Sequence, residues 1–323
     1  MPLARFSVTQ VRVAASCPRI LYFDAEQTRR QGLKAPAVTR IWKSGAGAET
    51  TACGSLFHAA VEKFNGEAAA DPAVRALLAA ADGPDAVRQE LVNHIYWKCL
   101  NRDALFEKTG PQQQAFLAAL RVYAGELADI LVFARKLGRP IDDVLDELFG
   151  DRRRRVDAEL PVGPGGEPVR VVGVLDYVFH DWRSGRRRIL DYKLTPADAP
   201  GNDLFQVCVY ALLHHHQYQT EADVGVLYLH PSRQMVEKKW EDVWAERGKV
   251  FNLLASMGEW VRYDERAGQG LKAPGDPVYC DACKWDGECV RRLGPKTEGG
   301  RIEAPAASDT RSGGVSPVSF SPL

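Results

Sequence analysis

The stretch ILDYKLT at residues 189–195 joins a short apolar run to an acid and a base two positions apart. In a β-strand, residues i and i+2 point to the same face, so Asp191 and Lys193 are expected to share one small volume. Taken alone, the pair fits a surface ion pair at a strand end, which is common in soluble proteins. Its meaning depends on what the neighbouring segments place beside it.

Alternating apolar and polar residues around this stretch predict a three-stranded meander. The three segments are RRRVDAELPV (153–162), VRVVGVLDYVFHDW (169–182) and RRRILDYKLT (186–195). The meander is followed by a predicted helix, an apolar strand and an amphipathic helix, at residues 203–219, 222–231 and 240–263. The expected fold class is therefore α/β, with a mixed sheet flanked by helices.

The segment before the meander is predicted to be mostly helical. Residues 26–50 are expected to form a loop, and the pattern becomes helical from Gly54 on. Residues 70–150 are rich in alanine, leucine and charge and predict several helices. The clearest helix spans 112–138, and Gly138 is expected to end it.

Composition limits the class of protein. The 323 residues carry 42 basic and 42 acidic side chains, so the net charge is zero and any nucleic-acid contact must use local basic patches. No run of about 18 apolar residues predicts a membrane span, and the N-terminus lacks the apolar core of a signal peptide. We therefore expect a cytoplasmic protein without membrane contact. Its seven cysteines are then expected to be structural, metal-binding or catalytic.

The middle strand of the meander contains a second acid, Asp176, directly after an apolar pair. Hairpin geometry can place Asp176 beside Asp191. Two adjacent carboxylates repel each other unless a cation lies between them, and Mg²⁺ prefers oxygen ligands. Lys193 would then orient an attacking water or stabilise charge on a phosphate.

Two further motifs lie on predicted helices. Gln206 and Tyr210 are four residues apart, on one helix face, and fit either a phosphate or sugar contact or an ordinary helix-surface pair. Upstream, GSLFH contains Gly54 and His58. His58 is followed four residues later by Glu62, so it fits either a metal ligand or a helix-surface pair.

Together, GSLFH, GVLDYV, LDYK and QVCVY resemble the motifs of the PD-(D/E)xK nuclease superfamily, and more narrowly of its RecB-like branch. The resemblance implies a restriction-endonuclease-like sheet and a Mg²⁺ or Mn²⁺ ion. The implied metal ligands are His58, Asp176, Asp191 and the backbone carbonyl of Tyr192. Lys193 would be the catalytic lysine, and Gln206 and Tyr210 would contact DNA. Glu159 is the candidate for the acid that this branch commonly has on its first core strand.

Three cysteines form a C-x2-C-x5-C group near the end of the chain: Cys280, Cys283 and Cys289. A four-thiolate site needs one more ligand, and Cys17 is the best candidate. The spacing allows either zinc or an iron–sulfur cluster. Cysteines split in this way resemble the 4Fe-4S staple of AddB-type nuclease domains and of CRISPR-associated RecB-like exonucleases, which favours iron–sulfur over zinc.

The resemblance also suggests a domain organisation. We expect one nuclease domain over residues 1–294, followed by a disordered tail over 295–323. Within the domain we expect a helical insertion at about 67–150, a catalytic core at about 152–265, and an Fe-S cap at 275–292 that is completed by Cys17.

The expected function is metal-dependent hydrolysis of DNA, by an exonuclease that acts on single-stranded or end-containing DNA. Such nucleases serve in DNA repair, CRISPR adaptation or phage defence, and a helicase or CRISPR/repair protein is a possible partner. One alternative is a DNA-end-binding or helicase-associated module with a weak or idle nuclease site. Another alternative is an iron–sulfur redox protein. Gln206 and Tyr210, which are expected to contact DNA, argue against it.

Overall fold

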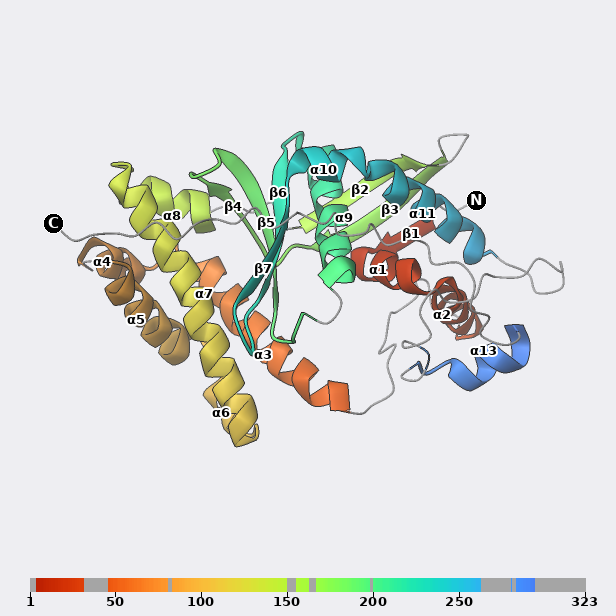
Figure 1. Ribbon diagram of the computed structural model, residues 1–323, viewed down its shortest axis with the longest axis horizontal. Coiled ribbons are helices and arrows are strands. Elements are labelled where there is room, and N and C mark those ends of the chain that lie inside the picture. The colour runs from red at the N-terminus through yellow and green to blue at the C-terminus, as the bar shows by residue number, and fades with distance from the viewer. Residues whose placement is uncertain are drawn as a thin grey trace, which may run out of the picture.

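A computed structural model describes residues 4–31, 46–80, 83–149, 155–162, 167–197, 200–262, 280 and 283–293 (Figure 1). The expected tail at 295–323 lies outside the described residues. No helix of the described part is long and apolar enough to cross a membrane.

Helices dominate the first half of the chain. They are α1 (Val8–Ser16), α2 (Pro18–Arg30), α3 (Ala46–Glu67), α4 (Pro72–Ala80), α5 (Pro84–His94), the π-helix η1 (Ile95–Cys99), α6 (Arg102–Phe106), α7 (Gly110–Lys136) and α8 (Ile141–Phe149). A short strand, β1 (Ala4–Ser7), precedes them.

The second half contains the sheets and the helices that cover them. Its elements are β2 (Arg155–Val162), β3 (Glu167–Val174), β4 (Tyr177–Asp181), β5 (Arg186–Lys193), α9 (Pro200–Tyr218), β6 (Ala222–Tyr228), β7 (Gln234–Lys238), α10 (Trp240–Ala245), α11 (Arg247–Trp260) and α13 (Asp286–Leu293).

The predicted meander is present, with a break in its middle strand. Leu175 and Asp176 separate β3 from β4. The first part, β3, pairs antiparallel with β2 and parallel with β1, whereas β4 pairs antiparallel with β5. Asp176 therefore lies at the junction of a three-stranded sheet, β1-β3-β2, and a four-stranded sheet, β4-β5-β6-β7.

Helix α9 connects the two parallel central strands of the larger sheet, β5 and β6. Figure 1 shows α9 on one side of that sheet together with α1 and α11, and helices α3 to α8 on the other side. This arrangement confirms a mixed α/β sheet flanked by helices, which is the restriction-endonuclease-like architecture.

Side chains of β5 alternate between two hydrophobic cores. Leu190 and Tyr192 pack with helices α3 to α8, whereas Ile189 packs with α9, α1 and α11. Because neighbouring strand residues point to opposite faces, Asp191 and Lys193 share the face of Ile189 and α9. The spacing of ILDYKLT therefore predicted the shared face correctly.

Local signals explain where the helices begin and end. Ser7 caps α1 through a reciprocal capping box with Gln10. Thr109 and Gln112 form the same box at α7, and Gly138 follows that helix with φ of 72°, a left-handed conformation that favours glycine. The predicted helix stop at Gly138 is confirmed.

Two predicted boundaries were wrong. The expected loop at 26–50 is helical at both ends, because α2 continues to Arg30 and α3 begins at Ala46. The expected helix at 240–263 is two helices, α10 and α11, which meet at Glu246. Glu246 is the C-cap residue of α10 and the N-cap residue of α11, and it forms an ion pair with Lys238 at 2.8 Å.

Candidate active site

Asp176 and Asp191 lie across from each other at the sheet junction. Tyr177 pairs with Leu190, so one further step of the antiparallel register sets Asp176 opposite Asp191. Asp191 is buried, and Lys193 Nζ lies 2.5 Å from its Oδ2. Burial, followed by the charge of Asp176 and a hydrogen bond with it, raises the pKa of Asp191 to about 6, although Lys193 opposes the shift.

His58 reaches these acids from α3. Its Nδ1 lies 3.4 Å from Asp176 Oδ2, and the same oxygen accepts a 3.3 Å hydrogen bond from the backbone N–H of Tyr192. Burial lowers the pKa of His58, although Asp191 and a hydrogen bond with the Tyr192 backbone act in the opposite direction. A lowered pKa favours the neutral imidazole, which is the form that binds metal ions.

The preceding residue, Phe57, fixes α3 against the sheet. Its ring is fully buried and makes edge contacts with Tyr123 and Tyr192, at centroid distances of 6.0 and 6.4 Å. Tyr192 is itself buried in the helical core, so its ring is occupied by packing. Only the backbone of Tyr192 is available to the acids.

Gln206 and Tyr210 are buried rather than on the helix surface. They are 8% and 7% exposed, and their side chains hydrogen-bond each other. Gln206 Oε1 is buried and has no hydrogen-bond partner. Tyr210 packs on Gly173, where an added Cβ would lie only 2.5 Å from Tyr210 Cε1 and 2.9 Å from Val8 Cγ2. The surface-pair interpretation of these two residues is therefore wrong.

Glu159 does not join the acids. It is exposed on β2 and pairs with Arg170, six residues before Asp176. At about 3.3 Å per residue, this separation is about 20 Å. The acid whose charge acts on His58 from its own helix is Glu62, one turn further along α3. The i+4 spacing had marked this neighbour.

Three residues near the acids were not singled out from the sequence. Arg12 Nη1 on α1 lies 3.1 Å from Asp203 Oδ1, and the hydroxyl of Tyr228 donates to Asp203 Oδ2 at 2.9 Å. Tyr228 is the β6 partner of Lys193. Asp203 precedes Gln206 by three residues, and this spacing is the signal that could have identified it.

The sequence has two basic runs, RRRR at 152–155 and RSGRRR at 183–188, and the second is largely paired within the protein. Its ion pairs are Arg183 with Asp181 at 3.2 Å, Arg186 with Glu241 at 2.5 Å, and Arg188 with Glu237 at 3.0 Å. Such pairing offsets the charge that a phosphate contact would need. In the other basic run, residues 152–154 lie outside the described part of the chain.

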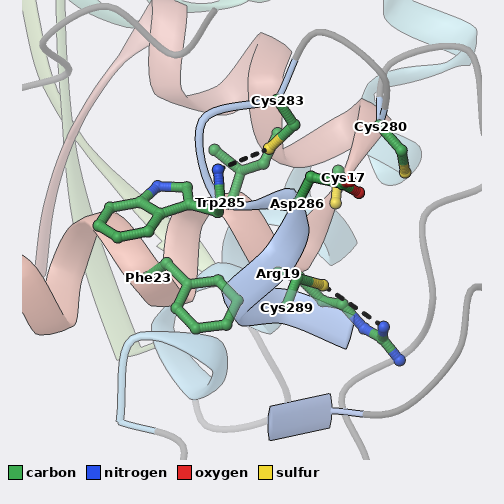
Figure 2. Close-up of a pocket in the computed structure, with 9 residues that line it drawn as sticks. Cys17, Arg19, Phe23, Cys280, Cys283, Trp285, Asp286 and Cys289 are labelled. Carbon is green, nitrogen blue, oxygen red and sulfur yellow. Dashed lines mark hydrogen bonds between the residues drawn. The ribbon is translucent and has the colours of Figure 1, made fainter. Parts of the chain in front are cut away.

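Four cysteines surround one pocket between α2 and the region around α13. Figure 2 shows Cys17, Cys280, Cys283 and Cys289 around this pocket, with Arg19, Phe23 and Trp285. Burial raises the pKa of Cys17 to about 12, and charges on Cys289 and Cys283 also raise it. The structure thus brings Cys17 to the three C-terminal cysteines. The remaining cysteines, Cys53, Cys99 and Cys208, are buried elsewhere.

Polar contacts hold the two walls of the cysteine pocket together. Buried Asp24 on α2 accepts a hydrogen bond from Trp285 Nε1 and forms an ion pair with Lys284, both at 2.9 Å. Phe23 stacks on Trp285 with ring centroids 5.5 Å apart. Buried Arg19 donates to Cys289 Sγ at 3.6 Å, as the dashed line in Figure 2 shows.

Neither group is arranged around a metal position as it stands. Among the described residues, no three His, Cys, Asp or Glu side chains are grouped so that they could hold a metal ion. At the acidic group, Lys193 Nζ lies 2.5 Å from Asp191 Oδ2, and the side chains of Asp191 and Asp176 hydrogen-bond each other. The donor types still match a hard divalent cation, because carboxylate oxygens and imidazole are its ligands.

The fold and the acidic junction define a protein of the restriction-endonuclease-like class. A family model described as the PD-(D/E)XK nuclease superfamily matches residues 5–290, so the chain belongs to that superfamily. Membership indicates a nuclease, an enzyme that hydrolyses phosphodiester bonds. Its members generally use Mg²⁺ or Mn²⁺.

The other comparisons add little. No curated protein matches the chain. The chain is similar to SSO0001, a solved crystal structure, at 12% identity and a TM-score of 0.29. That match covers 66% of this chain and 98% of the other.

Proposed function

We propose that the protein is a metal-dependent deoxyribonuclease of the RecB-like branch. The observation that carries the proposal is the meeting of Asp176 and Asp191 at the sheet junction, beside His58 and Lys193. Two carboxylates in contact, one of them buried with a raised pKa, form a site that a cation would stabilise.

The residues that would hold Mg²⁺ or Mn²⁺ are Asp176, Asp191, His58 and the backbone carbonyl of Tyr192. When bound, the ion would lower the pKa of a water molecule and stabilise negative charge on the phosphate. Asp191 Oδ2 supports this assignment, because it is buried, makes no hydrogen bond of good geometry and lies 2.5 Å from the charge of Lys193. To accept an ion, the two carboxylates must turn away from each other and from Lys193.

The other polar residues would act on the substrate. Lys193, released from Asp191, would orient the attacking water or stabilise the charge that develops on the phosphate. Gln206 and Tyr210 would contact the DNA strand. The unpartnered Oε1 of Gln206 supports this role, because a buried acceptor without a partner is costly unless a ligand or water completes it.

We further propose that the enzyme is an exonuclease that acts from DNA ends, in DNA repair, CRISPR adaptation or phage defence. This part rests on the RecB-like motifs. The alternative is a DNA-end-binding or helicase-associated module with an idle site.

For the cysteine pocket we propose a 4Fe-4S cluster held by Cys17, Cys280, Cys283 and Cys289, with zinc as the alternative. Four thiols lining one pocket match either metal. The cluster would tie α2 to the C-terminal segment without taking part in hydrolysis. After anaerobic purification, about four iron atoms and four sulfides per chain would support the cluster, and one zinc per chain would support the alternative.

Cleavage of labelled DNA tests the proposed function. Linear and circular DNA, single- and double-stranded, would be incubated with Mg²⁺, Mn²⁺ or EDTA, beside Asp191→Ala. We expect metal-dependent cleavage of linear DNA that is lost in the variant, and intact circles. Cutting of circles would contradict the exonuclease mode. DNA binding without any metal-dependent cleavage would favour the idle-site alternative.

A further inference from the structure

We infer that Arg12, on α1, binds a phosphate of the DNA strand next to the acidic site, and that Asp203 and Tyr228 hold it in position. This inference rests on the proposed function, and it assigns a role to residues outside the nuclease motifs.

The Arg12 guanidinium is positioned by a carboxylate that is itself fixed. Asp203 uses one oxygen for Arg12, at 3.1 Å, and the other for the hydroxyl of Tyr228, at 2.9 Å. Tyr228 is buried in β6, so this pair anchors Arg12 to the central sheet. A guanidinium has five N–H donors, and one bond to Asp203 does not exhaust them.

Arg12 stands at the outer end of a polar stripe that begins at the acids. Asp203, Gln206 and Tyr210 occupy positions i, i+3 and i+7 of α9, on one helix face. Exposure rises along the stripe: Tyr210 and Gln206 are buried, whereas Asp203 and Arg12 are partly exposed.

The inner end of the stripe is fixed beside Asp176. Tyr210 packs on Gly173, three residues before Asp176. Val8, one helix turn before Arg12 on α1, packs on the same glycine. Helix α1 and the stripe are therefore joined close to the sheet junction, and the charges of Arg12, Asp176 and Asp191 all act on Tyr210.

A phosphate fits this place better than a neutral group. Arginine forms bidentate, charge-assisted hydrogen bonds with phosphates. Arg12 and the arginines at 183–188 are all ion-paired within the protein, and what sets Arg12 apart is its place beside the acids. The unpartnered acceptor of Gln206, more than nine-tenths buried, is a second sign that the stripe meets a ligand, because it can accept a hydrogen bond from a base N–H of the same strand while Arg12 donates to the phosphate.

Salt-dependent DNA binding separates this role from a purely structural one. Affinity for a labelled single-stranded oligonucleotide would be measured in EDTA, at about 50 to 300 mM salt, for wild type, Arg12→Met and Arg12→Lys. The matched control is Arg139→Met, which loses an exposed ion pair with Glu147 of 2.8 Å. Arg139 lies between α7 and α8, and Figure 1 shows these helices across the sheet from α1.

We expect Arg12→Met to bind the oligonucleotide about tenfold more weakly. The slope of log K against log salt should become less steep by about 0.7, because one phosphate contact on a single strand is lost. Arg12→Lys keeps the slope, and Arg139→Met keeps both values. An unchanged slope in Arg12→Met, with wild type that binds and cleaves DNA, would overturn the inference alone. Wild type that binds no DNA would overturn the inference and the proposed function together. If methionine prevents folding, Arg12→Gln takes its place under the same criteria.

Discussion

The acidic junction and the cysteine pocket differ in how the chain assembles them. Asp176 and Asp191 belong to adjacent strands, so the register of one hairpin sets them side by side. The cysteine pocket brings Cys17 to residues more than 260 positions away, between α2 and the segment around α13. Backbone pairing positions the first group, and side-chain contacts position the second.

This difference predicts different sensitivities. Changes at the acidic junction should alter chemistry while the sheet stays folded, because the strand ladders do not depend on the acids. Changes at the cysteine pocket should alter stability, because the contacts of Asp24, Trp285 and Lys284 are what join its walls. The following variants test this division, starting with the largest expected effect.

Lys193→Met should lower the cleavage rate by about 10²- to 10⁴-fold, because it removes the group that serves the water or the phosphate. Cleavage of end-labelled DNA at saturating Mn²⁺ measures the effect. The matched control is Lys238→Met, which removes another largely buried lysine of the same sheet, paired with Glu246 at 2.8 Å. Equal losses in both variants would show that the lysine acts only through packing.

Asp191→Asn should stabilise the metal-free protein at neutral pH. The folded pKa of about 6 exceeds the ordinary value of 3.8, so this group's contribution to stability is complete below pH 4 and is lost as pH rises through 6. The stability gain of the variant over wild type should therefore be up to about 3 kcal/mol larger at pH 7.5 than at pH 4. Chemical unfolding in EDTA measures it.

Asp143→Asn, an exposed position on α8, is the control for that experiment and should show no such pH dependence. A gain for Asp191→Asn that is equal at both pH values would contradict the raised pKa.

Gly173→Ala should destabilise the protein by about 1–3 kcal/mol, because the new Cβ overlaps Tyr210 and Val8. It should also lower cleavage, since Tyr210 must shift. Gly66→Ala, a helical glycine with nothing within 4 Å of the added Cβ, is the control and should be neutral or stabilising. Thermal unfolding of both variants is the measurement, and a neutral Gly173→Ala would show that the packing adapts.

Arg292→Met should cost about 1–2 kcal/mol of stability and leave cleavage intact. Arg292 joins α13 to α2 through Glu26 at 2.6 Å and the Tyr22 hydroxyl at 2.9 Å. The neighbouring Arg291 is 72% exposed, and Arg291→Met should have little effect. Loss of cleavage in folded Arg292→Met would contradict the expectation that changes at the cysteine pocket alter stability and leave the chemistry intact.

Sequence reasoning was strongest where local periodicity determines geometry. The alternation in ILDYKLT predicted that Asp191 and Lys193 share a face, and the hairpin predicted the approach of Asp176. The C-x2-C-x5-C spacing predicted three cysteines in one place. Cys17 was chosen as the fourth ligand from its immediate surroundings, among them Pro18, and the resemblance then supported the choice. No local rule links residues at opposite ends of a chain.

The rest depends on tertiary contacts. The break at Asp176 arises because β3 and β4 pair with different strands, and strand periodicity alone does not reveal a change of partner. The Arg12–Asp203 pair joins α1 to α9, 191 positions apart. The prediction that Glu159 joins the acids was wrong. The sequence places Glu159 on the first strand of the meander, but it does not give the distance along the paired strands between Glu159 and Asp176.

The most direct test compares Asp191→Asn with Cys283→Ser in one assay: cleavage rate per folded molecule, below the unfolding temperature of both. We expect Asp191→Asn to lose at least about 10³-fold in rate without melting lower in EDTA, and Cys283→Ser to melt lower but to cleave at nearly the wild-type rate. Cleavage by Asp191→Asn at the wild-type rate, or an equal loss of rate in folded Cys283→Ser, would contradict this expectation.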